Sequence, residues 1–374
     1  MNRILILASY GPSLCNFRGA LIEELCRRGH EVHAAAPELI ADKTTRSWLE
    51  KRGVVCHNVS LSRSGLNPVA DLNTVRQTAS LMREISPDIF VGYTVKPVVW
   101  GLLAARIARV PKRVALITGL GYAFTGTANG LRRVVRNIVR GLYRMALRHA
   151  TLIFFQNSDD RSEFEFLGLL PDGVPVKIVA GSGVDTEYFT PSPFPPPPLR
   201  FLLIARLLGD KGIREYVAAA RELRESWPDT EFHLVGGTDP SPDGIPESEV
   251  AGWCNDNDVI WHGPLEDVRT SISATHVYVL PSYREGTPRT VLEAMAMGRP
   301  VVTTDAPGCR ETVINGINGF IVPVRDAKQL TIALTRFIQE PDLVSTMGSE
   351  SLKVARGKYD VHKVNAMMLK EMEL

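Results

Sequence analysis

Short apolar runs alternate with longer helical segments along the whole chain. The first run, residues 3–9, is almost continuously apolar, as is usual for a parallel strand that is buried on both faces. The loop YGPSLCNFRG and a helical segment up to Gly29 follow, and HEVHAAAP then predicts the next strand. A strand, a loop, a helix and a second strand at this spacing indicate a βαβ unit.

The same alternation continues through the first half of the chain. We expect further strands near residues 54–59, 89–93, 113–117, 152–156 and 176–179, with helices up to about residue 85 and at 97–109, 129–150 and 159–167. Such repetition predicts a doubly wound parallel sheet, whose ligands bind beyond the carboxyl ends of the strands.

A proline-rich segment, PSPFPPPPL, interrupts the alternation and then the rhythm restarts. We expect strands at residues 199–205, 231–235 and 259–262, another that ends before Pro281, and helices at 326–340 and 342–357. At 374 residues the chain is too long for one comfortable core. We therefore predict an α/β protein with two Rossmann-like domains, residues 1–190 and 199–357, joined by a linker at 191–198.

Charge is distributed unevenly between the two halves, although the formal net charge of the chain is only +2. Residues 1–195 hold 24 Lys+Arg and 16 Asp+Glu, which gives +8. The remainder holds 43 − 24 = 19 basic and 41 − 16 = 25 acidic residues, which gives −6. An anionic partner would therefore meet the first half.

Cysteine usage and the apolar runs bear on the compartment. The five cysteines are scattered without a CxxC pair, which favours a reducing compartment and predicts neither a disulfide framework nor a metal site. The start, MNRILILASY, lacks the pattern of a signal peptide, and no apolar run reaches the length of a membrane span. We expect a cytoplasmic protein.

Candidate chemistry is densest in PSYREGTPRTVLEAMAMGRP, residues 281–300. It predicts a strand end, a tight loop and a helix in which Thr287 is the N-cap and Pro288 takes the first helical position. Glu285 in the loop and Glu293 in the helix are separated by seven residues. Free N–H groups at a helix start attract a diphosphate, and carboxylates accept hydrogen bonds from sugar hydroxyls. Alternatively, this is a buried crossover helix with one solvated glutamate.

Other strand-end loops offer further binding groups. Gly11, in the first loop, would let a phosphate approach the backbone, or it simply permits a tight turn. Lys96 lies in GYTVKP, and TGLGYAFTG begins at Thr118 and supplies Gly119 and Tyr122. The latter loop could bind a sugar or lipid, or it could be a glycine-rich connection with core aromatics. A complete dinucleotide fingerprint is missing from the first loop, so NAD binding is poorly supported.

Residues 129–150 combine apolar residues at helical spacing with six arginines and no acidic residue. The arginines are Arg132, Arg133, Arg136, Arg140, Arg144 and Arg148. A basic amphipathic helix suits an anionic membrane surface. The alternative is a helix whose apolar stripe packs on its own domain while the arginines face water, and the two interpretations can coexist.

The run from Glu285 to Pro323, EGTPRTVLEAMAMGRPVVTTDAPGCRETVINGINGFIVP, resembles the donor-site signature of retaining nucleotide-sugar glycosyltransferases of the GT-B fold. The matching elements are the two glutamates with seven residues between them, Gly286 and Pro288, Gly298-Arg299-Pro300, Glu311 and Asn318-Gly319-Phe320. The resemblance is to the large bacterial family that assembles lipopolysaccharide, capsule and other glycans. It implies two doubly wound parallel-sheet domains facing across a cleft, with the tail 358–374 packed back on the first.

The resemblance also implies roles for individual residues. Arg206 and Lys211 would meet the donor diphosphate as catalytic groups, Glu293 would bind ribose hydroxyls, and Glu285 the donor sugar. The donor site would comprise Gly11, Arg206, Lys211, Gly286, Thr287, Pro288, Arg289, Thr290 and Glu293. The acceptor site would comprise Lys96, Thr118, Gly119 and Tyr122. In relatives, backbone near the Gly263-Pro264 turn holds the nucleobase.

Thr118 stands where many relatives carry a histidine, so this chain lacks the obvious side-chain base. It is similar here to the subgroup that extends polyprenyl-diphosphate-linked sugars, in which a TGLGY-type segment also occurs. The implied reaction is metal-independent transfer from a UDP-sugar, without a cofactor, to a lipid-linked saccharide at an anionic membrane surface. The acidic run 256–258 sits before a strand, as a turn would, and is not expected to bind metal. No nucleic acid partner is expected.

Three other functions remain open from the sequence. A nucleotide-sugar epimerase shares the two-domain layout, but it needs acid and base side chains at the sugar. A glycosyltransferase acting on a soluble acceptor would keep the same donor site. A catalytically silent subunit of a polysaccharide assembly is the non-enzymatic alternative, against which the Arg206 and Lys211 pair and both glutamates argue.

Overall fold

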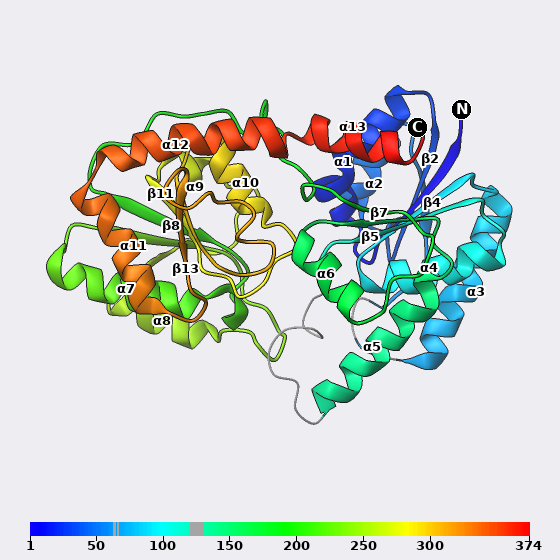
Figure 1. The fold of residues 1–374 in the computed structure, drawn as a ribbon, viewed down its shortest axis with the longest axis horizontal. Coiled ribbons are helices and arrows are strands. Elements are labelled where there is room, and N and C mark those ends of the chain that lie inside the picture. Colours follow the sequence, from blue (N-terminus) through cyan, green and yellow to red (C-terminus); the bar gives the residue numbers. More distant parts are fainter. Residues whose placement is uncertain (63–64, 66, 120–130) are drawn as a thin grey trace. The chain divides into compact units, whose positions relative to one another are not determined.

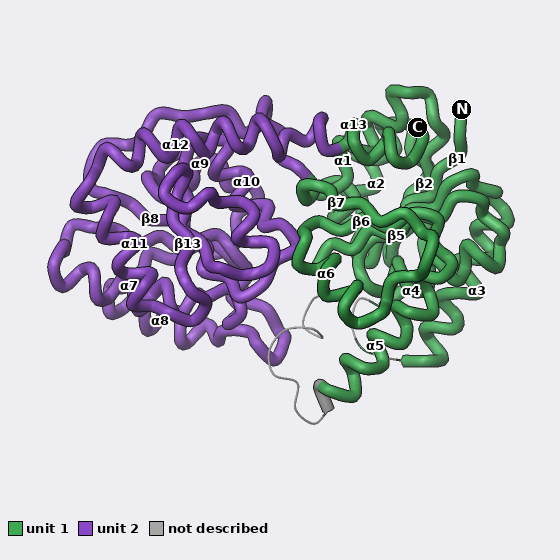
Figure 2. The backbone as a smooth tube through the Cα atoms, in the orientation of Figure 1, with its two compact units in different colours: residues 1–182, 365–374 green, residues 183–364 purple. Residues whose placement is uncertain are grey.

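The computed structural model describes residues 1–62, 65, 67–119 and 131–374. The chain forms two compact units, which Figure 2 colours separately. Unit 1 comprises Met1–Ser182 together with Asn365–Leu374, and unit 2 comprises Gly183–Val364. Each unit is an α/β domain built on a parallel sheet, which confirms the predicted fold class.

In unit 1 the described residues form a seven-stranded sheet in the order β3-β2-β1-β4-β5-β6-β7, with every neighbouring pair parallel. The strands are β1 Arg3–Leu7, β2 Glu31–Ala36, β3 Val55–Asn58, β4 Ile89–Tyr93, β5 Lys112–Ile117, β6 Leu152–Phe155 and β7 Val176–Ile178. The helices are α1 Pro12–Arg27, α2 Lys43–Glu50, α3 Pro68–Ile85, α4 Val95–Ile107, α5 Leu131–Leu147 and α6 Ser158–Phe166 (Figure 1).

Unit 2, which is described throughout, has a parallel sheet in the order β10-β9-β8-β11-β12-β13. The strands are β8 Arg200–Ile204, β9 Glu231–Val235, β10 Ile260–Trp261, β11 Val277–Leu280, β12 Val301–Thr304 and β13 Gly319–Val322. The helices are α7 Ile213–Ser226, α8 Glu247–Asn255, α9 Arg269–Ser273, α10 Arg289–Ala296, α11 Ala327–Gln339 and α12 Asp342–Val354, with a 3-10 turn at Gly209–Lys211. A π-helical turn at Ala355–Tyr359 leads into α13 Val361–Glu371.

Strand order changes direction at one place in each sheet, between β1 and β4 in unit 1 and between β8 and β11 in unit 2. Parallel strands leave a crevice for ligands outside their carboxyl ends at such a switch point. The central strands are buried on both faces, as their apolar sequences predict: all four residues of β11 are buried. Because β8 and β11 are neighbours in the sheet, the loops that follow them lie side by side.

The proline-rich segment is held to the rest of unit 2 by a buried arginine. The guanidinium of Arg299 is fully buried and donates to the backbone oxygens of Ser192 and Pro193 and to the hydroxyl of Ser192. It also donates to the backbone oxygens of Ile272, Ser273 and Met297, so hydrogen-bond acceptors surround its charge. Burial lowers the pKa of Arg299 to about 10. The role of this residue in the family-like signature is structural.

The expected loop at residues 10–19 was wrong. Helix α1 begins at Pro12, with Gly11 as its N-cap, because proline is well suited to a first helical turn. Arg18 and Gly19 therefore lie within the helix. Arg18 is buried, with its guanidinium 5.3 Å from the centre of the Tyr93 ring.

Residues 256–258 form the turn that their composition predicts. Asn257 has a φ of 59°, and the carboxylate of Asp258 accepts a hydrogen bond of 2.5 Å from Arg221. In the described part of the chain, no group of three His, Cys, Asp or Glu side chains is placed to hold a metal ion. None of the described helices is both long and apolar enough to cross a membrane.

Candidate active site

The candidate donor site lies at the carboxyl edge of the sheet in unit 2. Arg206 and Lys211 follow β8, and the loop with Glu285 follows β11. Because β8 and β11 are parallel neighbours, these two loops emerge next to each other at the switch point. The structure thus brings together residues that are about eighty positions apart in the sequence.

Lys211 and Glu285 form an ion pair at the centre of this edge. The Lys211 Nζ lies 2.6 Å from Glu285 Oε1, and both side chains are mostly buried, with 15% and 18% of their surface exposed. Burial disfavours the ammonium of Lys211, but the carboxylates of Glu285 and Asp210 outweigh this effect, so the pKa of Lys211 is raised. Lys211 is therefore charged at neutral pH, and an ammonium has three N–H donors, so a second partner can be bound.

Two glycines allow the backbone to approach closely around this pair. Gly212 has a φ of 69°, and a Cβ there would lie 2.1 Å from the backbone oxygen of Pro281. Gly308 has a φ of 76°, and a Cβ there would lie 2.3 Å from the backbone oxygen of Glu285. A side chain at either position would displace the segment that carries Glu285.

Arg206 is oriented by a carboxylate that the sequence did not single out. Its Nη1 lies 2.6 Å from Asp239 Oδ2, in the polar loop after β9. Arg206 is more than half exposed, whereas Asp239 is mostly buried. Because exposure leaves the guanidinium open to solvent, Arg206 can meet an anion beyond the strand ends while Asp239 holds it in place.

Helix α10 begins one residue later than expected. Pro288, with φ −72° and ψ 107°, is the N-cap, and Arg289 is the first helical residue, so the assignment of Thr287 as N-cap was wrong. Because Pro288 itself has an extended ψ, helical backbone begins only at Arg289, and Thr287 lies in the loop before the cap. The first N–H groups of α10 nevertheless lie at the carboxyl edge of β11, where an anion would bind.

The second glutamate of the signature lies inside α10. Glu293 is buried, and its Oε1 accepts a hydrogen bond of 2.8 Å from Arg289 one turn earlier. Burial raises the pKa of Glu293, and Arg289 offsets this only partly. Thr290 on the same helix accepts a hydrogen bond of 2.6 Å from the hydroxyl of buried Tyr278 on β11. This bond fixes the first turn of α10 against the sheet.

Asp210 and Glu215 line the same edge and were missed in the sequence. One carboxylate oxygen of each is buried without a hydrogen-bond partner, and burial raises the pKa of Asp210. Glu215 accepts a hydrogen bond of 2.5 Å from the hydroxyl of Tyr283, the residue two before Glu285. Charged residues on a loop and a first helical turn look like solvated ones in a sequence, so only the fold could reveal them.

The ends of β9 and β10 form a turn next to Arg206. The N–H of Gly236 donates to the backbone oxygen of Gly263 at 2.9 Å, and the N–H of Leu207 donates to that of Gly237 at 2.9 Å. The indole of Trp261 donates to the backbone oxygen of Gly236 at 2.9 Å. The Gly263-Pro264 turn, for which the resemblance implies base binding, is thereby tied to the end of β9, which in turn is bonded to Leu207, the residue after Arg206.

The predicted acceptor residues lie in unit 1. Lys96, on the first turn of α4, forms a buried ion pair with Asp71, with 2.9 Å between Nζ and Oδ1. Thr118 and Gly119 follow β5, and Gly119 has a φ of 125°. Tyr122 lies outside the described residues, so its role stays a prediction, as do those of Lys96, Thr118 and Gly119.

Gly11 also lies in unit 1, as the N-cap of α1 after β1, with a φ of −51°. A Cβ at this position would make ordinary contacts with Leu39 and Asp42, at 3.4 and 3.6 Å. The local backbone therefore does not require glycine, and an approach to a phosphate remains a prediction.

Helix α5 packs on unit 1 with one side and exposes another. Val139, Tyr143, Ala146 and Leu147 belong to the hydrophobic core of the unit. Val134, Ile138 and Met145, at helical spacing, are exposed apolar side chains (54%, 44% and 40%). Arg133, Arg144 and Arg148 are exposed and Arg136 and Arg140 are partly exposed, while the side chain of Arg132 lies outside the described part. The predicted packing of the helix on its own domain is therefore observed, whereas its binding to a membrane stays a prediction.

Arg144 has a second role that the sequence did not indicate. Its guanidinium donates to the backbone oxygens of Leu167 and Gly168 at 2.9 and 3.1 Å, just beyond the end of α6. These bonds satisfy carbonyl groups that a helix end leaves without partners. Arg144 thus stabilises unit 1 irrespective of any membrane.

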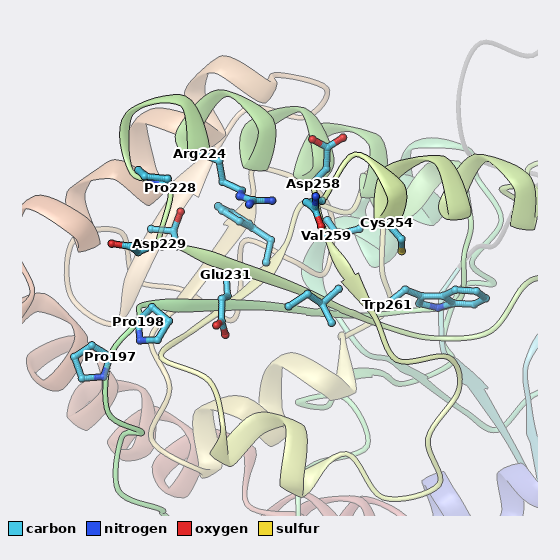
Figure 3. A pocket seen from close by; sticks show the side chains of 14 residues that line it. Pro197, Pro198, Arg224, Pro228, Asp229, Glu231, Cys254, Asp258, Val259 and Trp261 are labelled. Carbon is cyan, nitrogen blue, oxygen red and sulfur yellow. The ribbon is translucent and has the colours of Figure 1, made fainter.

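A pocket of about 830 Å³ opens at the opposite edge of the sheet in unit 2 (Figure 3). Pro197, Arg224, Glu231, Asp258 and Trp261 are among its lining residues. Glu231 begins β9 and Asp258 precedes β10, so most of this pocket lies at the amino ends of the strands. It is distinct from the candidate donor site at the carboxyl edge.

These features define a two-domain nucleotide-sugar transferase of the GT-B class, with a cation pair and a helix start at the switch point of the second sheet. The family model described as "Glycosyl transferase 4-like" matches residues 3–157, and the one described as "Glycosyl transferases group 1" matches residues 198–340. The chain belongs to this family of GT-B glycosyltransferases, as the resemblance in the sequence implied.

Two curated relatives are similar over most of the chain. The N,N'-diacetylbacillosaminyl-diphospho-undecaprenol alpha-1,3-N-acetylgalactosaminyltransferase of Campylobacter jejuni is 27% identical, over 98% of this chain and 97% of its own. The UDP-Gal:alpha-D-GlcNAc-diphosphoundecaprenol alpha-1,3-galactosyltransferase of Escherichia coli is 25% identical, over 75% of this chain and 72% of its own.

Solved structures share the fold. Anabaena HepE in complex with UDP and glucose superposes with a TM-score of 0.76 at 19% identity and covers 100% of both chains. Sucrose-phosphate synthase from Thermosynechococcus elongatus superposes with a TM-score of 0.82 at 18% identity, over 100% of this chain and 98% of its own. At this identity the likeness establishes the architecture.

Proposed function

We propose that this protein is a retaining hexosyltransferase that moves a sugar, an N-acetylhexosamine or another hexose, from a UDP-sugar to a polyprenyl-diphosphate-linked saccharide. The observation that carries the proposal is the placement of Lys211, Glu285, Arg206 and the start of α10 around one strand edge. Two cations and a helix start suit a diphosphate, and carboxylates suit sugar hydroxyls. The two relatives named above are transferases with diphosphoundecaprenol-linked saccharides in their names.

In the proposed donor site, Lys211 and Arg206 bind the diphosphate together with the first N–H groups of α10. Glu293 accepts hydrogen bonds from the ribose hydroxyls, and Glu285 binds the hydroxyls of the donor sugar. The remaining predicted donor contacts, from Gly286, Arg289 and Thr290, belong to the loop and helix that carry these glutamates. Orientation by Asp239 and Asp210 would prepare both cations before the donor arrives.

The proposed chemistry is attack on the face from which the diphosphate leaves. The bond between the anomeric carbon and the diphosphate oxygen breaks, and a bond to the acceptor oxygen forms. The acceptor's hydroxyl proton passes to a donor phosphate oxygen. Positive charge from Lys211 and Arg206 stabilises the leaving diphosphate, so the proposal requires no covalent nucleophile, metal or cofactor.

The proposed acceptor is held at the inner face of the cell membrane, with which the protein associates peripherally. Support comes from the exposed face of α5, where Val134, Ile138 and Met145 lie on the same helix as Arg133, and exposed Arg148 follows directly after its end. Apolar side chains can enter the headgroup region while arginines contact anionic lipids. The +8 charge of residues 1–195 acts in the same direction.

The test is a screen of UDP- and GDP-sugars with a polyprenyl-diphosphate-linked saccharide, in which the product is identified by mass. We expect a mass increase of one sugar unit with a UDP-sugar, and the anomeric configuration of the donor in the product. Transfer only to soluble saccharides would contradict the proposed acceptor. A product of inverted configuration would contradict the proposed mechanism.

One incubation distinguishes the epimerase alternative from the proposed transferase. If UDP-N-acetylglucosamine alone is converted to its epimer, the protein is an epimerase and the transfer proposal is wrong. For a silent subunit, neither incubation would give a product, and Glu285→Ala and Lys211→Ala would leave all measured functions unchanged.

A further inference from the structure

A hydrogen-bonded network of four charged or polar side chains runs from β8 across β9 to the end of β10 in unit 2. Arg200 on β8 donates to Glu231 on β9, with 2.6 Å between Nε and Oε2. The same carboxylate oxygen lies 3.2 Å from His233 Nε2, two residues further along β9. His233 Nδ1 lies 2.9 Å from Nε2 of His262, the residue that follows β10.

A corresponding network occurs in unit 1 on β1, β2 and β3. Arg3 on β1 donates to Glu31 on β2 at 3.0 Å, and Glu31 lies 2.9 Å from His33 Nε2. His33 Nδ1 lies 2.9 Å from His57 Nε2 on β3. The histidine rings are stacked in both units, with centroids 5.1 Å apart in unit 1 and 5.2 Å apart in unit 2. The two arrangements differ in that Arg3 and His33 contact different oxygens of Glu31, whereas Arg200 and His233 share Oε2 of Glu231. The protein thus offers two closely similar arrangements, of which only one lies in the unit with the candidate donor site.

The hydrogen-bond partners determine where the protons lie. An ionised carboxylate only accepts, so His233 must carry a hydrogen on Nε2 to bond Glu231. A neutral His233 then accepts through Nδ1, and His262 must donate from Nε2. One extra proton on His262 leaves this direction intact. A further proton on His233 Nδ1 would set two N–H groups against each other and break the pair.

The network in unit 2 ends at the Gly263-Pro264 turn, which lies beside the candidate donor site. His262 immediately precedes Gly263 and Pro264, and its N–H donates to the backbone oxygen of Leu234 at 2.9 Å. The backbone oxygen of Gly263 accepts from Gly236 at 2.9 Å. Strand β10 has only two residues, and the side-chain bond from His262 to His233 adds to these backbone bonds in holding the turn to β9.

We propose that His233 and His262 are positioning residues that hold the Gly263-Pro264 turn in the conformation that receives the nucleobase of the donor. The inference rests on the proposed function, since it assumes that UDP binds at this edge. His233 acts only through His262, because its ring nitrogens are engaged by Glu231 and His262. The carboxylate, in turn, holds the tautomer of His233, and Arg200 keeps that carboxylate ionised.

A pH dependence follows from the same geometry. The ionisable groups around His233 are Glu231 on its own strand, Arg200 on β8 and His262 after β10. Burial lowers the pKa of His233, and the charges of His262 and Arg200 add to this effect against the opposing effect of Glu231. With its pKa lowered from the ordinary value of 6.5, His233 is neutral at neutral pH, so the pair is intact there. Protonation of His233 in the folded protein, and with it the loss of the pair, requires a pH below 6.5.

The experiment is isothermal titration calorimetry of UDP into the full-length protein. We expect His233→Ala and His262→Ala each to raise the Kd for UDP roughly fivefold, the effect of one lost hydrogen bond. The double variant should be no weaker than either single one, because both changes break the same link. His262→Gln, which keeps a donor at the position of Nε2, should bind close to wild type. It should also show a smaller rise in Kd at acid pH than wild type, because the amide can turn its oxygen to accept from a protonated Nδ1 of His233.

The matching control is His33→Ala, which breaks the closely similar arrangement in unit 1. It should show a comparable loss of thermal stability and an unchanged Kd for UDP. The proposal is overturned if His233→Ala binds UDP as wild type does, which would leave His262 at most a direct contact. It is also overturned if His33→Ala weakens UDP binding as much as His233→Ala. If wild type does not bind UDP at all, the proposed function fails and this inference fails with it.

Discussion

The ammonium of Lys211 lies 2.6 Å from a carboxylate oxygen of Glu285, although the two residues are 74 positions apart in the sequence. The ion pair restricts the positions of both side chains at the place where β8 and β11 end. In the proposed function, the first residue meets the leaving diphosphate and the second the donor sugar. The ion pair would therefore set the distance between the two ends of the bond that breaks.

Removing the ammonium should affect both catalysis and stability. We expect Lys211→Ala to lower kcat/KM about 100- to 1000-fold, because a preorganised cation at the leaving group is lost. Because Glu285 keeps a mostly buried carboxylate without its counterion, the free energy of unfolding should fall by about 1–3 kcal/mol. Steady-state kinetics and denaturant titration measure the two effects.

The control for this variant is Lys353→Ala. Lys353 also forms an ion pair, at 2.7 Å with Glu350, but it is 70% exposed. Exposed pairs contribute about 0–1 kcal/mol, so both kinetics and stability should stay close to wild type. Equal kcat/KM for Lys211→Ala and Lys353→Ala would remove Lys211 from the catalytic machinery.

Glycine substitutions should have opposite effects at two positions in unit 2. Gly308→Ala places a Cβ 2.3 Å from the backbone oxygen of Glu285 at a φ of 76°, so we expect a loss of about 1–3 kcal/mol in unfolding free energy and reduced transfer. Gly252→Ala, in helix α8, meets no atom within 4 Å and should stabilise by about 0.5–1 kcal/mol. Thermal unfolding checks the signs, and a stable, fully active Gly308→Ala variant would contradict the packing around Glu285.

The buried carboxylate of Glu293 predicts a particular pH dependence of stability. Its pKa is raised in the folded state, so the folded protein binds more protons than the unfolded chain in the interval above the ordinary value of 4.5. Stability should therefore fall as pH rises through that interval. Glu293→Gln should lack this component, while its donor affinity drops because an amide oxygen is a weaker acceptor than a carboxylate.

Denaturant titrations of wild type and Glu293→Gln across pH 4–7 test this prediction. We expect the difference in unfolding free energy between them to change with pH in favour of the variant as pH rises. A difference that stays constant over this range would mean that Glu293 titrates as an ordinary carboxyl group.

The exposed face of α5 should determine binding to lipid. We expect Arg133→Glu with Arg148→Glu to weaken binding to anionic vesicles on the order of 10- to 30-fold, since each arginine near the surface contributes about 1 kcal/mol. Arg144 is unsuitable for this test, because it also satisfies the end of α6.

Co-sedimentation with vesicles of defined anionic content measures this binding. The control pair is Arg83→Glu with Arg106→Glu, which makes the same change of charge at exposed positions on α3 and α4. If both pairs weaken binding equally, net charge rather than the α5 face holds the protein to lipid. If neither does, the peripheral association proposed here is wrong.

The fold was predictable because its signals are local. Apolar runs such as residues 3–9 can only be buried strands when helices alternate with them, and the two parallel sheets followed from that alternation. Glu285, Glu293, Arg206 and Lys211 could be singled out as candidates, since their spacing and flanking glycines resemble a family signature, and the fold places them at one edge of the second sheet. Each of these signals is contained within about forty residues.

What could not be predicted depends on distant partners. Asp239 is recognisable as a partner of Arg206 only once β8 and β9 lie side by side. Lys96 was predicted to lie in a strand-end loop, but it lies on the first turn of α4 and is paired with Asp71 from the preceding helix. The start of α1 was missed because the turn residues around Gly11 obscured the proline that begins the helix.

A crystal structure of the protein with UDP tests the central claim most directly. We expect the phosphorus atoms to lie at the carboxyl edge of β8 and β11. Lys211 Nζ, the Arg206 guanidinium and the first N–H groups of α10 should be within hydrogen-bonding distance of phosphate oxygens. If UDP instead occupies the pocket at the amino edge of the same sheet, or lies away from Lys211 and Arg206, the proposed donor site is wrong.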